Sequence, residues 1–348
     1  MPDVESHRAR VVVDGKFFRL GRGKFFARGV TYGPFAPNAA GEHFCSPTQT
    51  AYDFDQMRAW GVNLLRIYDV PPEWFLELAA SQGLLLMVDV PWNKQACLDD
   101  APAREAARRA VREAAVSCAG HRAVFGISVV NELPPDIVRW TGPATVESFL
   151  EELVGEVKGV DAECLCTFGS FPPTEYLRVR AIDFVCFNVY LHHPQAFRNY
   201  LARLQVLADS KPLMLGEFGL DSLREGESRQ AELLESGIES VFQAGAAGAV
   251  VFSFTDEWFK DGLSIEDWRF GITTAARVPK PAAIAVQNAY RGAPRFQAVS
   301  RPMVSVVVAS YNGARTLAAC LESLAAVSYP ACEVILVDDG STDETPEI

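Results

Sequence analysis

The chain has 348 residues, of which 49% are hydrophobic and 22% charged; this excludes a mainly disordered protein and allows one large domain or two. Thirty-two Lys and Arg residues against 44 Asp and Glu residues give a net charge of −12. We therefore expect no nucleic-acid partner, because phosphate contacts need clustered positive charge. The opening MPDVESHRAR predicts no secretory signal, and no apolar run reaches the ~20 residues of a membrane span, so we expect a cytoplasmic protein.

The first 28 residues predict a short β preface. Two strand-like runs in RVVVDGKFFRL flank Asp14-Gly15, a pair typical of a two-residue hairpin turn.

From residue 29 onward, apolar strand-like runs alternate with helix-like stretches. The runs are nearly continuous, as in a sheet buried on both faces. Eight repeats predict an α/β fold, a (β/α)8 barrel over residues 29–296. The predicted strands are Gly29–Tyr32, Val62–Tyr68, Leu84–Val90, Val124–Val130, Leu165–Phe168, Phe184–Tyr190, Leu213–Phe218 and Ala249–Phe254. The predicted helices are Phe54–Trp60, Pro72–Ser81, Ala103–Cys118, Val146–Val157, Pro194–Ala208 and Ser228–Ala244.

A doubly wound open sheet is the alternative architecture. It would carry a Gly-rich phosphate turn after its first strand. The residues at that place, VTYGPFAPN, lack the G-x-G-x-x-G spacing, so the barrel is favoured.

Two of the predicted strands end in a glutamate. The fourth ends in GISVVNELPP, with Asn131 and Glu132 at its tip, and the seventh ends in LMLGEFGLD, with Glu217 at its tip. Catalytic groups of a barrel gather at these carboxyl ends, and a carboxylate that closes an apolar run is costly to bury unless it is used or paired. Glycoside cleavage needs two facing carboxyl groups, one to protonate the leaving oxygen and one to attack the anomeric carbon. We therefore predict Glu132 and Glu217 as a catalytic pair rather than as ion-paired rim residues.

The stretch from about Gly29 to Trp258 resembles the clan of retaining glycoside hydrolases with (β/α)8 barrels. The resemblance implies that Asn131-Glu132 are the Asn-Glu pair that carries the acid/base, and that Glu217 is the nucleophile. WGVNLLRIYDVP is similar to the second strand of that clan, FVCFNVYLHH to the sixth and VVFSFTDEW to the eighth.

Within that clan, the chain resembles two families, the β-galactosidase/β-glucuronidase-like enzymes and the β-1,3-glucan hydrolases and transglycosylases, and RIYDV favours the second without excluding the first. The β-galactosidase/β-glucuronidase-like family carries a histidine where this chain has Asp69. The clan's second-strand arginine corresponds to Arg66 and its sixth-strand tyrosine to Tyr190. Both are candidate partners that keep Glu217 ionised, although Arg66 has a simpler alternative as a rim salt bridge to Asp69 or Asp89.

Other side chains after the strands are candidates for holding sugar. Asn131 is expected to hydrogen-bond the sugar 2-OH, and His192 is a candidate for other hydroxyls. Asp221, Asp256 and Glu257 add negative charge to the rim, which favours a neutral or cationic sugar over a uronic acid. Aromatic rings provide flat faces for sugars, and Trp92 and Trp258 are the foremost of the seven that follow predicted strands: Tyr32, Phe35, Tyr68, Trp92, Trp140, Tyr190 and Trp258.

No metal or cofactor is expected. Only Cys164 and Cys166 are close among eight scattered cysteines, and a second close pair that would complete a tetrahedral metal site is missing. Reduced thiols are the expected state.

Residues 302–348 predict a strand, a helix, a second strand and a loop. VSVVVASYNGARTLAACLESL and VDDGSTDET resemble the start of a family-2 glycosyltransferase, and the resemblance implies nucleotide contacts by Asp338 and Asp339. About 45 residues cannot bury a full α/β core. We therefore expect an incomplete N-terminal piece of that domain, with membrane association only through the part of the parent protein beyond Ile348.

Together these features predict a retaining glycoside hydrolase or transglycosylase that acts on a β-linked, glucan-like oligosaccharide or polysaccharide, within a hydrolase–glycosyltransferase fusion. The alternative is a catalytically inactive barrel that binds polysaccharide and guides it for the transferase. A barrel enzyme of unrelated chemistry, such as an aldolase, would use a lysine at a strand end, whereas Lys94 lies in a loop and Lys211 precedes strand seven.

Overall fold

The computed structural model describes residues 10–294, 302–327 and 329–348. The N-terminal nine residues, where the sequence predicts no signal, lie outside the described residues, as does the predicted end of the barrel domain at residue 296. The chain divides into two compact units, Met1–Phe296 and Gln297–Ile348, and each is described by itself.

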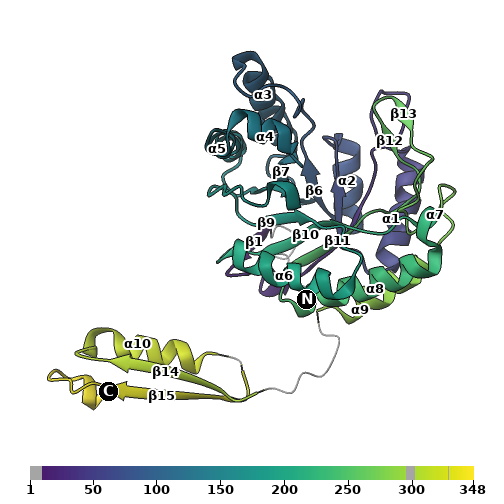
Figure 1. Ribbon diagram of the computed structural model, residues 1–348. Coiled ribbons are helices and arrows are strands. Elements are labelled where there is room, and N and C mark those ends of the chain that lie inside the picture. The colour runs from purple at the N-terminus through teal and green to yellow at the C-terminus, as the bar shows by residue number, and fades with distance from the viewer. Residues whose placement is uncertain (1–9, 295–301, 328) are drawn as a thin grey trace. The chain divides into compact units, whose positions relative to one another are not determined.

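The first unit is built around a closed barrel of eight parallel strands, in the order β10-β11-β4-β5-β6-β7-β8-β9 (Figure 1). This confirms the predicted fold class and excludes the open doubly wound sheet. Each predicted strand is present, although β5, β6, β9 and β11 are shorter than expected. The strands are β4 (Ala27–Thr31), β5 (Leu64–Ile67), β6 (Leu85–Asp89), β7 (Val124–Asn131), β8 (Leu165–Ser170), β9 (Val185–Asn188), β10 (Leu213–Phe218) and β11 (Gly248–Val251).

Helices surround the barrel (Figure 1). Local signals start several of them: the side chains of Ser46 and Asp100 accept hydrogen bonds from the first turns of α1 and α3. Two short helices, α4 and α7, were not expected, and the β8–β9 connection holds only the short 3-10 helix η2 (Pro172–Thr174). The helices are α1 (Pro47–Ala59), α2 (Glu73–Gln82), α3 (Ala101–Cys118), α4 (Pro135–Thr141), α5 (Pro143–Val160), α6 (Pro194–Ala208), α7 (Ser222–Glu225), α8 (Glu227–Gln243) and α9 (Pro281–Gly292).

The N-terminal preface is a three-stranded antiparallel sheet: β1 (Val11–Asp14), β2 (Phe17–Leu20) and β3 (Gly23–Phe25). The predicted hairpin is present, but its two-residue turn is Gly15-Lys16, because Asp14 pairs with Phe17. Phe18 of β2 is fully buried, with its ring centroid 5.0 Å from that of Phe125 and 5.4 Å from that of Phe184. These partners lie where barrel strands begin, so the sheet covers the amino end of the barrel.

The carboxyl end of the barrel carries a further small hairpin. Strands β12 (Phe259–Lys260) and β13 (Leu263–Ser264) follow β11 and project from the barrel on the side of α1 and α2, opposite α3 (Figure 1).

The second unit is a single βαβ element, as predicted. Strands β14 (Val304–Ser310) and β15 (Cys332–Asp338) pair in parallel, and α10 (Ala314–Ala325) connects them; η3 (Thr345–Glu347) follows. Among the described residues of this unit, Leu317 and Thr345 are the buried ones. No helix in the described part of the chain is long and apolar enough to cross a membrane.

Candidate active site

The carboxyl ends of the barrel strands hold a buried polar network. Arg66 comes from β5, Asp89 from β6, Asn131 from β7, Asn188 from β9 and Glu217 from β10. Arg66, Asp89, Asn188 and Glu217 are all buried. Buried charges are expensive unless they are paired and hydrogen-bonded, so the contacts within this network decide its chemistry.

Arg66 is the centre of the network. Its Nε lies 2.6 Å from Oδ2 of Asp89 and its Nη2 lies 3.0 Å from Oδ1 of the same carboxylate. Nη1 of Arg66 donates to Oε1 of Glu217 at 3.1 Å and to Oδ1 of Asn188 at 2.8 Å. Nη2 also donates to Oδ1 of Asn131 at 2.8 Å. The structure thus contains both alternatives considered for Arg66, the salt bridge to Asp89 and the contact with Glu217; Asp69 is not a partner. A five-donor guanidinium locked on both sides fixes the position of the Glu217 carboxylate.

Glu217 accepts hydrogen bonds from two tyrosines as well. Tyr68 donates to Oε1 at 2.7 Å and Tyr190 donates to Oε2 at 2.9 Å. Burial raises the pKa of Glu217 above its ordinary value; Arg66 and the two hydroxyls offset this rise only in part, and the charge of Glu132 adds to it. Because Arg66, Tyr68 and Tyr190 all donate to its oxygens, the arrangement fits the ionised carboxylate, which is the form a nucleophile needs.

Glu132 lies beyond the tip of β7 and is half-buried. Its backbone is in the left-handed region, with φ at 48°, and its Oε1 accepts a hydrogen bond of 2.8 Å from Nδ2 of Asn188. The other end of the Asn188 amide accepts from Arg66. Glu132 and Glu217 are therefore joined by a chain of hydrogen bonds through Asn188 and Arg66. A strained backbone held by such contacts is typical of functional sites.

Two glycines make room for the guanidinium. A Cβ on Gly169 of β8 would lie 2.5 Å from Oδ1 of Asn131 and 2.8 Å from Nη2 of Arg66. A Cβ on Gly216 of β10 would lie 2.7 Å from Nη1 of Arg66 and 2.8 Å from Oδ1 of Asn188. These approaches are shorter than real Cβ contacts, so any larger residue would displace the network. The strand register also shifts close to Asn131 and to Glu217.

The network forms the floor of a pocket of about 960 Å³. One wall is aromatic: the ring centroid of Phe252 lies 4.9 Å from that of Trp258 and 5.5 Å from that of Trp268, and Trp268 packs against Phe270 at 5.0 Å. Tyr190 packs edge-on against Phe252 and Phe270. A large pocket with aromatic walls and converging polar groups is a typical small-molecule site.

Most of the predicted site residues line this pocket: Glu132, Glu217, Asn131, Tyr68, Tyr190, Trp92 and Trp258. Arg66 lies beneath it and acts through its contacts. Tyr68 differs from its predicted use as a sugar platform, because its hydroxyl is bonded to Glu217. Trp92 is anchored by its Nε1, which donates to the backbone oxygen of Val129 at 2.7 Å.

Four predicted residues do not line this pocket: Tyr32, Phe35, Trp140 and His192. Phe35 is buried, and Trp140 of α4 is exposed. Tyr32 is buried under the rings of Phe35 and Phe254, and its hydroxyl donates to Oδ2 of Asp53 at 2.8 Å. It supports the barrel wall and does not reach the pocket. His192 lines a separate cavity of about 30 Å³ between α6 and α8.

The acidic rim residues do not make the mouth negative. Asp256 pairs with Lys280 at 2.7 Å, Asp221 pairs with Arg224 at 3.3 Å, and Glu257 pairs with Arg277. This removes the basis on which the sequence favoured a neutral or cationic sugar.

The site also contains residues that sequence reasoning missed, namely Asn188 in the polar network and several residues that line the pocket. Asn188 could have been found from the sequence, because it is a single amide in the apolar run FVCFNV. Phe171, Trp268 and Phe270 come from irregular loops, which carry no periodic pattern. The lysines Lys94 and Lys260 line the wall too, although the sequence placed Lys94 only in a loop. Within the described residues, no group of three or more His, Cys, Asp or Glu side chains is arranged to hold a metal ion.

Known proteins resemble the two units separately. The barrel is similar in structure to a β-galacturonidase from Eisenbergiella tayi, with a TM-score of 0.70 and 18% identity over 82% of this chain and 54% of that one. It is similar to a β-glucuronidase from Ruminococcus gnavus, with a TM-score of 0.69 and 18% identity over 81% of this chain and 53% of that one. A β-glucuronidase from Bifidobacterium dentium gives a TM-score of 0.70 at 19% identity, over 82% of this chain and 49% of that one.

Residues 305–348 match the family model described as glycosyl transferase family 2. This region is 48% identical over 46 residues to the glycosyltransferase GlyG of Streptococcus pneumoniae, covering 13% of this chain and 15% of that protein. It is 51% identical over 49 residues to the putative glycosyltransferase EpsE of Bacillus subtilis, covering 14% of this chain and 18% of that protein.

The chain thus spans about half the length of the similar structures and less than a fifth of these two glycosyltransferases. The resemblance of the first unit to barrel glycoside hydrolases is confirmed as a likeness of fold, and the resemblance of the C-terminal segment to family-2 glycosyltransferases is confirmed by the family model.

Proposed function

We propose that the barrel is a retaining glycoside hydrolase or transglycosylase that cleaves a β-linked glycan. One observation carries this proposal: the Glu217 carboxylate is held by Arg66, Tyr68 and Tyr190, and it is joined through Asn188 to a second carboxyl group, Glu132, in an aromatic-walled pocket. Two carboxyl groups with such different surroundings are what a two-step displacement requires.

In the first step, Glu217 attacks the anomeric carbon while the protonated Glu132 gives its proton to the glycosidic oxygen. The bond from that carbon to the leaving sugar breaks, and a covalent glycosyl–Glu217 ester forms. In the second step, Glu132 takes a proton from water or from an acceptor hydroxyl, whose oxygen displaces Glu217. Water gives hydrolysis and a sugar acceptor gives transfer, with retained configuration in both cases.

The other residues support these steps. Arg66 and the two tyrosines keep Glu217 ionised before the attack and aimed into the pocket. Asn131 lies beside Glu217, with its Nδ2 3.4 Å from Oε1, where it is available to the hydroxyl next to the reacting carbon. Trp92 and the wall of Phe252, Trp258 and Trp268 provide faces for sugar rings.

The neighbouring structures and the C-terminal segment support a carbohydrate substrate. The similar solved structures are those of a β-galacturonidase and of β-glucuronidases, and the family match at residues 305–348 links the barrel to sugar transfer. RIYDV favours a β-glucan-like chain. In this proposal the barrel trims or re-links a polysaccharide that the transferase makes.

Incubation with a panel of 4-nitrophenyl β-glycosides and β-linked glucans tests the activity. We expect release of nitrophenol or of shortened or re-linked oligosaccharides, with the β-anomer formed first by NMR. Glu217→Gln should lower kcat at least about a thousandfold, and Glu235→Gln, an exposed glutamate of α8, should not.

Glu132→Gln should slow natural glycans far more than substrates with good leaving groups, because only the former need its proton. Added azide should restore turnover of the activated substrates and give a β-glycosyl azide. If wild type and Glu217→Gln bind glycans equally and neither turns them over, the barrel is the binding module that the sequence left as its alternative.

A further inference from the structure

We propose that the leaving-group side of this pocket binds an anionic sugar residue, held by Lys94 and Lys260. This inference names a substrate class for the function proposed above and rests on it. The anion is a carboxylate or a phosphate carried by the sugar that departs in the first step, or by the acceptor that replaces it.

Lys94 is the primary group. It follows β6, is half-buried, and lines the pocket with its Nζ 2.5 Å from the backbone oxygen of Asn131, the residue before Glu132. It forms no ion pair with any residue in the described part of the chain. Burial lowers the pKa of this lysine, and the charge of Glu132 raises it. A half-buried ammonium that meets only a neutral carbonyl leaves its remaining protons free for a ligand in the pocket.

Lys260 adds a second positive charge to the pocket. It lies on β12, lines the pocket, and is exposed. It too has no ion-pair partner among residues 10–294, 302–327 and 329–348, and its charge lowers the pKa of Lys94. Two cations that repel each other across a substrate pocket are stabilised when an anion binds between them.

Most of the other charged residues that line the pocket have partners or roles of their own. Asp89 is paired with Arg66, and Arg224 is paired with Asp221. Glu132 and Glu217 are reserved for the reaction. Asp267 is the remaining carboxylate of the wall among the described residues; it opposes an anionic ligand, so Asp267→Asn should strengthen its binding.

The position of Lys94 indicates on which side of the pocket the anionic sugar binds. Glu132 delivers its proton to the glycosidic oxygen and therefore lies where the leaving sugar departs. Since Lys94 is bonded to the backbone immediately before Glu132, its ammonium reaches the departing sugar and the incoming acceptor rather than the ring that bonds to Glu217.

Three disaccharides test this assignment: cellobiose, β-glucosyl-(1→4)-glucuronic acid, and β-glucuronosyl-(1→4)-glucose. They carry no charge, an acid on the leaving sugar, and an acid on the attacked sugar. Dissociation constants are measured by tryptophan fluorescence on full-length Glu217→Gln, which does not turn the ligands over. The second disaccharide should bind at least about tenfold more tightly than cellobiose, and 0.5 M NaCl should weaken that preference. A fourth ligand, with glucose 6-phosphate as the leaving sugar, distinguishes phosphate from carboxylate.

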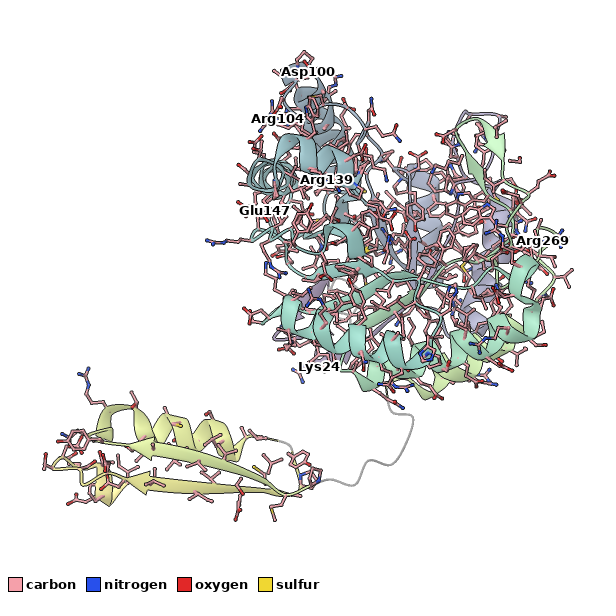
Figure 2. The ribbon with its side chains drawn as sticks, in the orientation of Figure 1. Lys24, Asp100, Arg104, Arg139, Glu147 and Arg269 are labelled. Carbon is pink, nitrogen blue, oxygen red and sulfur yellow. The ribbon has the colours of Figure 1, made fainter. Side chains whose placement is uncertain are left out.

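Lys94→Met should abolish the preference, Lys94→Arg should keep part of it, and Lys260→Met should reduce it about threefold, because an exposed ammonium interacts through water. The matched control is Lys24→Met. Lys24 lies on β3 at the opposite end of the barrel from the β12–β13 hairpin (Figure 2). Circular dichroism verifies that each variant is folded.

Equal binding of the neutral and acidic ligands would overturn the proposal, as would a preference for the acid on the attacked sugar. The inference and the proposed function fail separately. Wild type that turns over no glycoside refutes the hydrolase, whereas the ratio of dissociation constants still decides whether Lys94 and Lys260 bind an anion.

Discussion

The two ends of the barrel are held by different kinds of contact, apolar at the amino end and polar at the carboxyl end. At the amino end, the β1–β3 sheet places Phe18 on Phe125 and Phe184, and the cluster around them is almost wholly apolar. At the carboxyl end, the same strands finish in an arginine, two carboxylates and two amides that are buried or half-buried and bonded to one another.

The difference shows which end carries stability and which carries chemistry. Apolar burial stabilises the fold without any required geometry. The hydrogen bonds and ion pairs of a buried polar network add little to stability once the cost of desolvating its charges is subtracted. Such a network is therefore typical of sites whose chemistry needs its geometry. Substitutions at the two ends should therefore separate loss of folding from loss of turnover.

Arg66→Met is expected to have the largest combined effect. It leaves Asp89 and Glu217 buried without their cation, which should lower the free energy of unfolding by about 3–5 kcal/mol. Turnover should fall by more than about a hundredfold, because Glu217 loses its fixed position. Urea denaturation and kcat measure the two effects. A variant as stable and active as wild type would mean that the network is dispensable.

Phe18→Ala should produce the reverse pattern. A cavity beneath the β1–β3 sheet should lower the free energy of unfolding by about 3–5 kcal/mol, while kcat at 20 °C stays within about twofold of wild type. Phe17→Ala, on the half-buried neighbour, is the control and should cost less. A large loss of kcat in folded Phe18→Ala would show that the two ends are coupled.

Tyr68→Phe should shift the pH profile rather than abolish activity. The hydroxyl lowers the pKa of Glu217, so removing it leaves Glu217 protonated up to a higher pH. The acid limb of kcat/KM should therefore move to higher pH, as measured by the pH dependence of kcat/KM. Tyr190→Phe should move it the same way, and Tyr200→Phe, whose hydroxyl binds Glu175, should leave it in place.

Tyr32→Phe should have the smallest effect. It removes one buried hydrogen bond to Asp53, which keeps Gln49 and Arg277 as partners. We expect a loss of about 1 kcal/mol in the free energy of unfolding and unchanged kcat and KM. A fall in kcat/KM without a loss of stability would restore Tyr32 to the binding site.

The strands and the two glutamates were predictable from the sequence because buried parallel strands are unbroken apolar runs, and a carboxylate at the end of one is conspicuous. The same local pattern does not distinguish Tyr32 from Tyr68. Each follows a strand, and the partner that decides its role lies far along the chain: Asp53 for Tyr32 and Glu217 for Tyr68.

The loops were the least predictable part of the site. Lys94 and Trp268 reach the pocket because irregular segments fold over the barrel end, and Lys260 reaches it from the two-residue strand β12. No periodicity marks such a path. At Gly169 and Gly216 a Cβ would collide with side chains from other strands, those of Asn131, Cys186 and Arg66 among them, and such an approach is a property of the tertiary structure alone.

The β1–β3 sheet also imposes an order on biosynthesis. Phe18 is translated before the rings that cover it, which belong to residues 125 and 184, and β4 completes the barrel only when β11 has been translated. The β1–β3 segment therefore stays without these partners until residue 184 has been translated. A protease or a chaperone acting on the nascent chain would find exposed aromatic residues in this segment, which becomes the apolar cover of the folded barrel.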